Sequence, residues 1–209
     1  MSGRISLLAL LAISGWTFFA ASAIFLPIFS EYSFAGDYIS ELAIGSFGYV
    51  QKFAFFAAGL GSLALALGIR ETTRGSWGSR AGFVMVGLFG INVFLAGVFP
   101  TDAINAEGQV LSPTIAGTVH IVVSLLAFLL IIAAMFVLSM TFKQNVRWRS
   151  FWPISLVLAF AALVTFFLTS DGQWAGLYQR VFIGTIVLWL VLAAIRLRSI
   201  ARTKSVPAG

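Results

Sequence analysis

Long runs of hydrophobic residues, separated by short polar segments, divide the chain into six parts. A transmembrane helix needs about 20 consecutive apolar residues. Runs of this order lie near residues 5–29, 46–69, 81–99, 113–141, 151–169 and 175–195. None of them alternates apolar and polar residues as the strands of a membrane barrel do. Since only helices and closed barrels satisfy the backbone in lipid, we predict an all-α bundle of six transmembrane helices.

The overall composition agrees with this prediction. Of the 209 residues, 60% are hydrophobic and 10% are charged, and the mean hydropathy is +1.00. We therefore expect one membrane domain over residues 1–209, ending in a flexible tail at 203–209. The chain has no cysteine, which excludes disulfides, thiolate metal sites and thiol nucleophiles.

The first run contains Ala21-Ser22-Ala23, which is typical of the small-residue cleavage site of a signal peptide. The apolar run nevertheless continues through Pro27 to Phe29. We therefore expect the segment to be retained as the first transmembrane helix.

The distribution of charge predicts the orientation in the membrane. Eleven of the 13 basic residues fall on the N-terminus, the second and fourth loops and the C-terminus, and only Lys52 and Arg180 fall on the other side. The positive-inside rule then places both termini in the cytoplasm. The net charge of +6 is thus a topology signal that favours contact with membrane lipids rather than a nucleic-acid partner.

Small residues indicate where helices pack against each other. Ala57, Gly61, Ala64 and Gly68 form one stripe in the second run, and Gly90 and Gly97 form another in the third. Such stripes let helix backbones approach closely. We expect them to pack within the bundle, although they could also mediate dimerisation.

Candidate functional residues gather at the predicted outer side of the membrane. His120 and Arg180 lie within spans, where an ionisable group is costly and therefore a functional hypothesis. The outer loops add acidic side chains at Asp37, Glu41, Asp102, Glu107 and Asp171. We predict an outward-facing polar pocket formed by Asp37, Glu41, Asp102, His120 and Arg180.

Each of these residues also has a structural interpretation. His120 can be a packing residue, a proton acceptor or a ligand, and Asp102 is its expected partner. Arg180 can pair with Asp102, Glu41 or Asp171, or it can recognise an anionic group. Asp37 is expected to cap a short helix that Gly45 ends, and Asn92 to form interhelical hydrogen bonds.

A metal site is a weaker possibility. Asp37 and Glu41 are four residues apart and would share a helix face, so with Asp102 and His120 they could bind a divalent cation. One histidine falls short of a three-histidine zinc site. We expect no metal and no cofactor, and if a metal were bound, its ligands would be Asp102, His120 and Glu41.

Four motifs carry a resemblance to a known family. They are Asp37-Tyr38-Ile39-Ser40-Glu41-Leu42, Phe99-Pro100-Thr101-Asp102, Gly117-Thr118-Val119-His120 and Gly176-Leu177-Tyr178-Gln179-Arg180. With them the chain resembles a family of six-span prokaryotic membrane proteins known as domain of unknown function 998. The resemblance implies a six-helix fold in the cytoplasmic membrane of a prokaryote, with its polar motifs at the outer face.

A looser similarity connects the chain to membrane-embedded metal-dependent hydrolases of the alkaline ceramidase and progestin-receptor-like group. These proteins also gather acidic residues and histidines at one membrane face, but this chain lacks their additional histidines. We expect a non-enzymatic protein whose pocket binds a lipid head group, a small ligand or a partner subunit. The alternatives are a hydrolase acting on lipid, with Asp102 and His120 as its catalytic residues, and an accessory subunit of a larger membrane complex.

Overall fold

A computed structural model of the chain describes residues 2–104, 109–110, 112–168 and 173–203. The described residues form six α-helices and no strand, which confirms the predicted all-α bundle. The helices are α1 (Ser2–Phe25), α2 (Gly48–Thr72), α3 (Trp77–Val98), α4 (Ile115–Gln144), α5 (Trp152–Leu168) and α6 (Ala175–Thr203). Two short 3₁₀ helices, η1 (Leu26–Phe29) and η2 (Ile39–Ala43), lie between α1 and α2.

The helix ends differ from the hydrophobic runs in two places. The first run is divided, because the α-helix ends at Phe25 and η1 continues with Pro27 near its start. The last helix continues to Thr203, past Arg196 and Arg202, since a helix can extend beyond the apolar layer that defines a run. The remainder of the predicted tail, 204–209, lies outside the described residues.

Five of the described helices, all except α5, are long and apolar enough to cross a membrane. The exception, α5, has 17 residues and is also apolar. At 1.5 Å per residue it is about 25 Å long, which is at the lower limit for a transmembrane helix.

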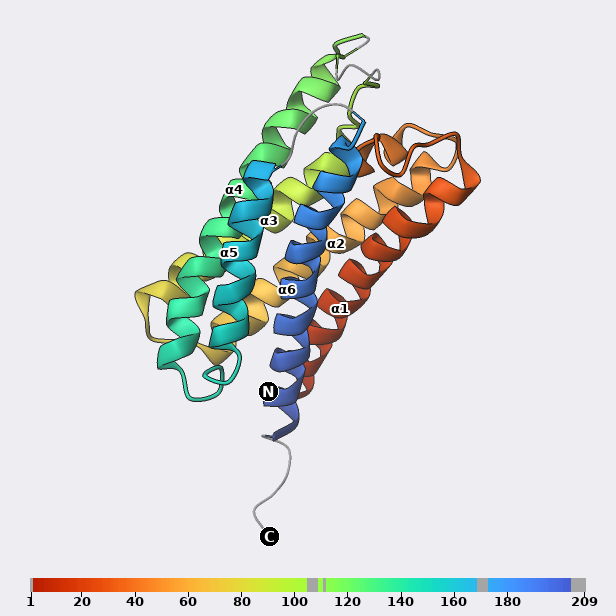
Figure 1. Cartoon of the computed structure of the whole chain (residues 1–209). Helices are drawn as coiled ribbons and strands as arrows, with labels where there is room; N and C mark the ends of the chain where they lie inside the picture. The colour runs from red at the N-terminus through yellow and green to blue at the C-terminus, as the bar shows by residue number, and fades with distance from the viewer. Residues whose placement is uncertain (1, 105–108, 111, 169–172, 204–209) are drawn as a thin grey trace.

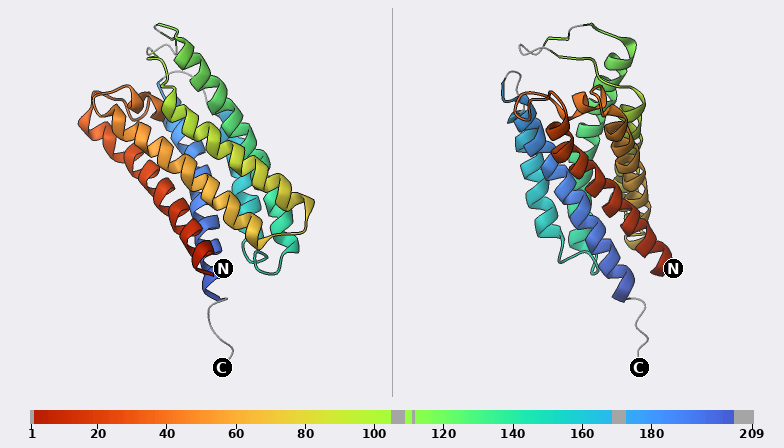
Figure 2. Two further views of the ribbon diagram at one scale, coloured as in Figure 1. Left: turned by 180° about the vertical axis from the view of Figure 1, so that it is seen from behind. Right: turned by 90° about the vertical axis from the view of Figure 1, so that its right-hand side faces the viewer.

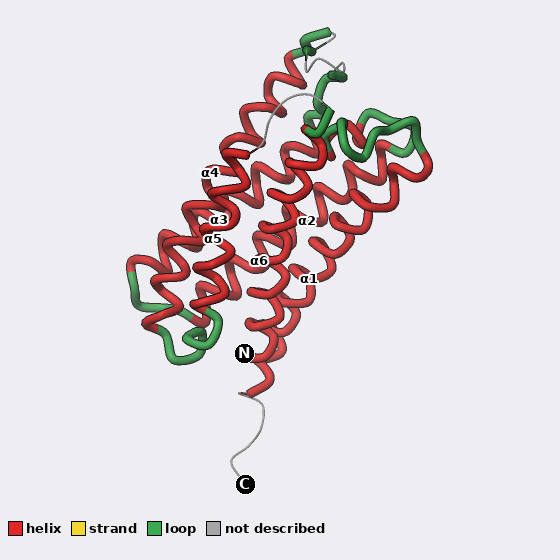
Figure 3. The backbone as a smooth tube through the Cα atoms, viewed as in Figure 1, coloured by secondary structure: helices red, strands yellow, loops and turns green. Residues whose placement is uncertain are grey.

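The helices run side by side (Figure 1), and their contacts close into a ring. Each helix packs against the next one in the chain, and α6 packs against both α5 and α1. Figure 2 shows the same arrangement from behind and from the side. Figure 3 shows that the loops gather at the two ends of the bundle. We call the end where α1 starts and α6 finishes the terminal end, and the opposite end the distal end.

Glycines allow the closest helix contacts. A Cβ atom on Gly59 of α2 would lie 2.7 Å from the carbonyl oxygen of Gly90 in α3, and one on Gly90 would lie 2.8 Å from the carbonyl oxygen of Gly59. Gly61, in contrast, faces α1 at Leu11 and Ala12. The predicted stripes therefore pack within the bundle, and Gly59 provides a second small face of α2 that the sequence analysis missed.

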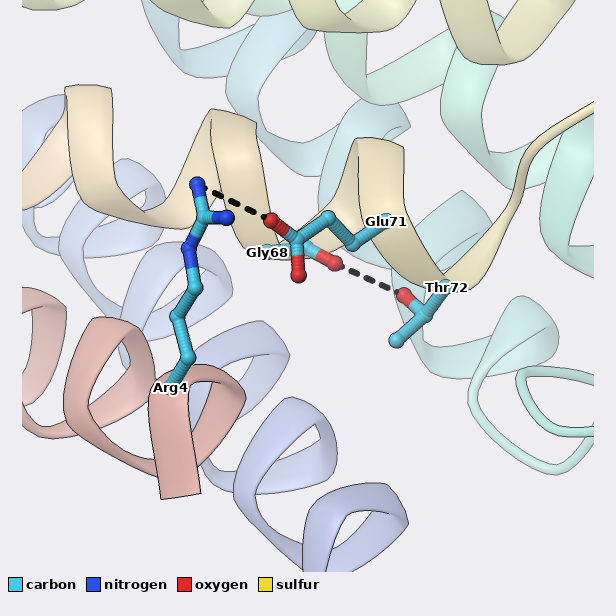
Figure 4. A network of polar contacts seen from close by, with 4 residues as sticks. All are labelled: Arg4, Gly68, Glu71 and Thr72. Carbon is cyan, nitrogen blue, oxygen red and sulfur yellow. Dashed lines mark hydrogen bonds and ion pairs between the residues drawn. The ribbon is translucent and has the colours of Figure 1, made fainter. Parts of the chain in front are cut away.

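Polar side chains connect the helices toward the terminal end. The indole Nε1 of Trp148 donates to Thr72 Oγ1 at 3.1 Å, and Trp189 Nε1 donates to Ser155 Oγ at 2.8 Å. Both tryptophans are fully buried. Figure 4 shows the Thr72 hydroxyl bonded to the Gly68 carbonyl, and Arg4 paired with Glu71 at 3.2 Å. The two buried indoles at this end of the bundle therefore both have hydrogen-bond acceptors.

Candidate functional site

The loop between α1 and α2 is fastened to α6 by Arg180. Arg180 Nη1 donates to the carbonyl oxygens of Asp37 and Gly176, both at 2.9 Å, and Nη2 donates to the Tyr32 hydroxyl at 2.7 Å. The guanidinium also lies over the Phe34 ring, 4.3 Å from its centroid. In the described part of the chain Arg180 forms no ion pair, so the expected pairing with Asp102 or Glu41 is wrong. Asp171 and Glu107 lie outside the described residues.

The carboxylate of Asp37 does not cap the short helix as predicted. Its Oδ2 accepts a hydrogen bond from the Ser33 amide at 2.7 Å instead. The cap is formed by Glu41, whose Oε1 accepts from the Tyr38 amide at 2.9 Å. The short helix then ends at Ala43, before Gly45.

Burial controls the ionisation of two side chains in this loop. Burial raises the pKa of Glu41 above its ordinary value, and the Asp37 carboxylate adds to this effect. Burial also raises the pKa of Tyr32 to about 12, even though Arg180 opposes the shift. The Tyr32 phenol is therefore protonated at neutral pH and can donate its hydrogen to the carbonyl oxygens of Asp37 and Tyr38.

Asp102 holds the beginning of α4. Its Oδ2 accepts from the Thr114 amide at 3.0 Å, and its Oδ1 accepts from the Thr114 hydroxyl at 2.7 Å. These bonds lower the pKa of Asp102. Thr114 Oγ1 also accepts from the Gly117 amide, and a side chain on Gly117 would collide with the Asp102 carboxylate. Asp102 therefore stabilises the first turn of α4, and its expected hydrogen bond with His120 is absent.

His120 bonds to backbone carbonyls of α3 and the residue that follows. The side chain is 4% exposed, and its Nδ1 lies 2.7 Å from the Phe99 oxygen and 3.2 Å from the Ala96 oxygen. A carbonyl oxygen can only accept, so Nδ1 carries the hydrogen. In the neutral ring, Nε2 therefore keeps an unprotonated lone pair. The ring also meets Phe55 of α2 edge to face, with centroids 6.2 Å apart.

A cavity of about 440 Å³ lies inside the distal half of the bundle. All six helices, η2 and the loop after α3 line it. Its aromatic walls are Trp16, Phe19, Phe55, Phe89, Phe128 and Phe166, and its polar side chains are Tyr38, Ser40, Asn92, Thr101, His120, Ser124 and Gln179. No charged side chain of the described chain lines this cavity. It is an apolar chamber with a few uncharged hydrogen-bonding groups.

A smaller cavity of about 190 Å³ lies in the loop between α1 and α2. The acidic side chains of Glu31, Asp37 and Glu41 line it, together with Tyr32. The five predicted pocket residues are therefore divided: His120 lines the large cavity, Asp37 and Glu41 line the small one, and Asp102 and Arg180 line neither.

This division bears on the possible metal site. No group of three or more histidine, cysteine, aspartate or glutamate side chains in the described ranges is placed to hold a metal ion. In particular, His120 faces carbonyl groups, while Asp102 and Glu41 accept from Thr114 and from backbone amides. The ligand set Asp102, His120 and Glu41 is not assembled.

Two cavity residues change what the sequence analysis expected. Gln179 was not among the predicted pocket residues, although it precedes Arg180 in one of the four motifs. Its Oε1 accepts from the Ile39 amide at 2.7 Å. Asn92 was expected to bond between helices, but its amide donates to the Leu88 carbonyl of its own helix at 2.8 Å.

Comparison with known proteins places the chain in a family. A family model described as "Protein of unknown function (DUF998)" matches residues 7–196, which is most of the chain. The chain therefore belongs to this family, as its four motifs indicated. No curated protein and no solved structure matches it.

Proposed function

We propose that this member of the DUF998 family is a multi-span membrane protein that binds a lipophilic small molecule in its distal cavity. The cavity volume of about 440 Å³ is the single observation that carries the proposal. Ligand pockets have volumes of about 300 to 1,000 Å³, whereas packed protein interiors leave few voids larger than a water molecule. A cavity of this size supports a role in binding.

The walls of the cavity determine the kind of ligand. Aromatic side chains from five helices and aliphatic side chains supply the apolar contact surface, and an uncharged polar group such as His120 or Gln179 can fix the orientation of the ligand. A buried charge without a partner is costly, so the buried part of the ligand is neutral. The other four predicted pocket residues, Asp37, Glu41, Asp102 and Arg180, act as positioning residues for the segments around the cavity.

The same proposal includes the orientation in the membrane. The proposed location is the cytoplasmic membrane of a prokaryote, and eleven of the 13 basic residues favour a cytoplasmic terminal end. In this orientation the cavity lies in the outer half of the bilayer. The absence of cysteine makes this testable without background. In intact cells, a membrane-impermeant thiol reagent should label Ser112→Cys at the distal end and leave Ser199→Cys near the terminal end unlabelled. The reverse pattern would contradict the orientation.

Binding itself can be tested by filling the cavity. Ala127 lines the cavity on α4 and is buried, whereas Ala161 on α5 lies outside its lining. Native mass spectrometry of the protein purified in mild detergent should show a retained lipophilic molecule in the wild type. Ala127→Phe should lose it, and the control Ala161→Phe should keep it. A wild-type protein without bound lipophile, or equal retention by both variants, would contradict the proposal.

A further inference from the structure

One wall of the cavity reaches the outer surface of the bundle. Ile121 and Leu125 of α4 line the cavity, yet their side chains are 55% and 48% exposed. Partly buried Ile183 and Gln179 line the cavity from α6. Figure 1 shows α4 extending beyond the end of α5 toward the distal end. The cavity is therefore bordered on α4 by side chains that also face the surroundings of the bundle.

Aromatic rings close the bundle below this border. Phe128 of α4 meets Phe182 of α6 with ring centroids 5.0 Å apart, and Phe166 of α5 meets the same ring at 5.4 Å. Phe182 is almost fully buried. The exposed border at Ile121 and Leu125 therefore lies on the distal side of these rings.

Because α4 and α6 are both long and apolar enough to cross a membrane, this border is expected to face hydrocarbon. A molecule that passes Ile121 and Leu125 comes from the bilayer, where uncharged lipids dissolve and ions do not. This matches the lining of the cavity, which has no charged side chain in the described part of the chain.

The hydrogen-bonding groups specify the ligand further. His120 uses its Nδ1 hydrogen on carbonyl oxygens, so the neutral ring offers a ligand only the acceptor Nε2. Gln179 uses its Oε1 on the Ile39 amide, so it offers a ligand its amide hydrogens. A hydroxyl group is suited to both, since it donates one hydrogen and accepts others.

We propose that the ligand is an uncharged lipid bearing a hydroxyl group, which moves from the bilayer into the cavity beside Ile121 and Leu125 and donates its hydroxyl hydrogen to His120 Nε2. This rests on the proposed function, because it names the ligand class and the route of the same cavity. The lipid chain lies against the aromatic walls, and the hydroxyl accepts from Gln179.

The chemical part of the proposal is tested with a matched pair of probes, oleyl alcohol and its methyl ether, titrated into delipidated protein and measured by native mass spectrometry. The alcohol should bind about 5- to 10-fold more tightly, the value of one hydrogen bond. His120→Asn removes the Nε2 acceptor while its amide can still donate to the Phe99 carbonyl. It should reduce the preference to about one.

The results separate this inference from the proposed function. Equal binding of both probes that Ala127→Phe abolishes would overturn the hydroxyl preference and leave the cavity as a binding site. Binding of neither probe would overturn the proposed ligand class, and it would overturn the proposed function as well if the purified wild type also retains no lipophilic molecule. A preference for the alcohol that survives in His120→Asn would overturn the role of Nε2.

The route is tested by the rate of binding. Ile121→Trp should slow the uptake of oleyl alcohol, because the larger side chain narrows the opening. Val122→Trp is the matched control, since Val122 is 52% exposed on the same helix but does not line the cavity. Equal uptake rates in the two variants would overturn the route.

Discussion

The contact between Gly59 and Gly90 leads to a sharp prediction about stability. A Cβ on Gly90 would lie 2.8 Å from the Gly59 oxygen and 2.9 Å from Ser62 Cβ. Carbon atoms normally approach other atoms to about 3.5 Å, so Gly90→Ala requires α2 and α3 to separate locally by about 0.7 Å. The obstacle is largely helix backbone, which cannot rotate away. Overpacking of this kind costs about 1 to 3 kcal/mol.

Gly90→Ala also increases helix propensity, and this gain in unfolding free energy must be separated from the cost of the collision. Alanine is favoured over glycine within a helix by about 1 kcal/mol. Gly87 lies one turn earlier in α3, and a Cβ there meets nothing within 4 Å. Gly87→Ala therefore obtains the gain without the collision. The difference in unfolding free energy between the two variants should be the full cost of about 1 to 3 kcal/mol.

Reversible unfolding in mixed detergent micelles, followed by circular dichroism, measures this difference. Gly90→Ala should unfold at a lower denaturant concentration than Gly87→Ala, and Gly59→Ala should behave like Gly90→Ala, since its Cβ would lie 2.7 Å from the Gly90 oxygen. Shifts of the same sign and size for Gly87→Ala and Gly90→Ala would refute the close approach of α2 and α3.

Three further predictions follow, two on pH and one on a buried hydrogen bond. Because the pKa of Asp102 is lowered, the ionised carboxylate stabilises the fold above its ordinary value of 3.8, and this effect is lost as the pH falls through the folded-state pKa. Asp102→Asn should therefore flatten the acid side of a plot of melting temperature against pH. An unchanged acid side would count against the Thr114 bonds. The raised pKa of Glu41 has the opposite effect on stability, because the ionised side chain opposes folding above that pKa. Acidification toward the ordinary value of 4.5 should therefore stabilise the wild type and not Glu41→Gln. Thr72→Val leaves the buried indole of Trp148 without its acceptor and should cost about 1 to 3 kcal/mol of unfolding free energy, whereas Thr185→Val, at an exposed hydroxyl, should change it little.

The helices were predictable from the sequence because the hydrophobic runs that cross lipid are long and leave few alternatives. The helix-packing glycines were predictable for a similar reason, since a small residue is useful mainly where another backbone is close. Gly59 was missed because it lies off the stripe of Ala57 and Gly61, on a face of α2 that only the position of α3 makes important.

The candidate site was predicted less well, and the reason is physical. Charged groups were expected to find opposite charges, but His120 and Arg180 bond mainly to backbone carbonyls, which are present in every residue and leave no mark in a sequence. Asp102 similarly accepts from Thr114, which was not considered as its partner. The large cavity depends on which faces of six helices turn inward, and no single run of residues encodes that.

The contact between α6 and α1 has a consequence for biosynthesis. Because α6 closes the ring by packing against α1, the face of α1 that contacts α6 has no helix to pack against until translation is almost finished. The interface between the two helices can therefore form only at the end of synthesis. A chain that is truncated before α6 would be an open row of helices rather than a smaller closed bundle.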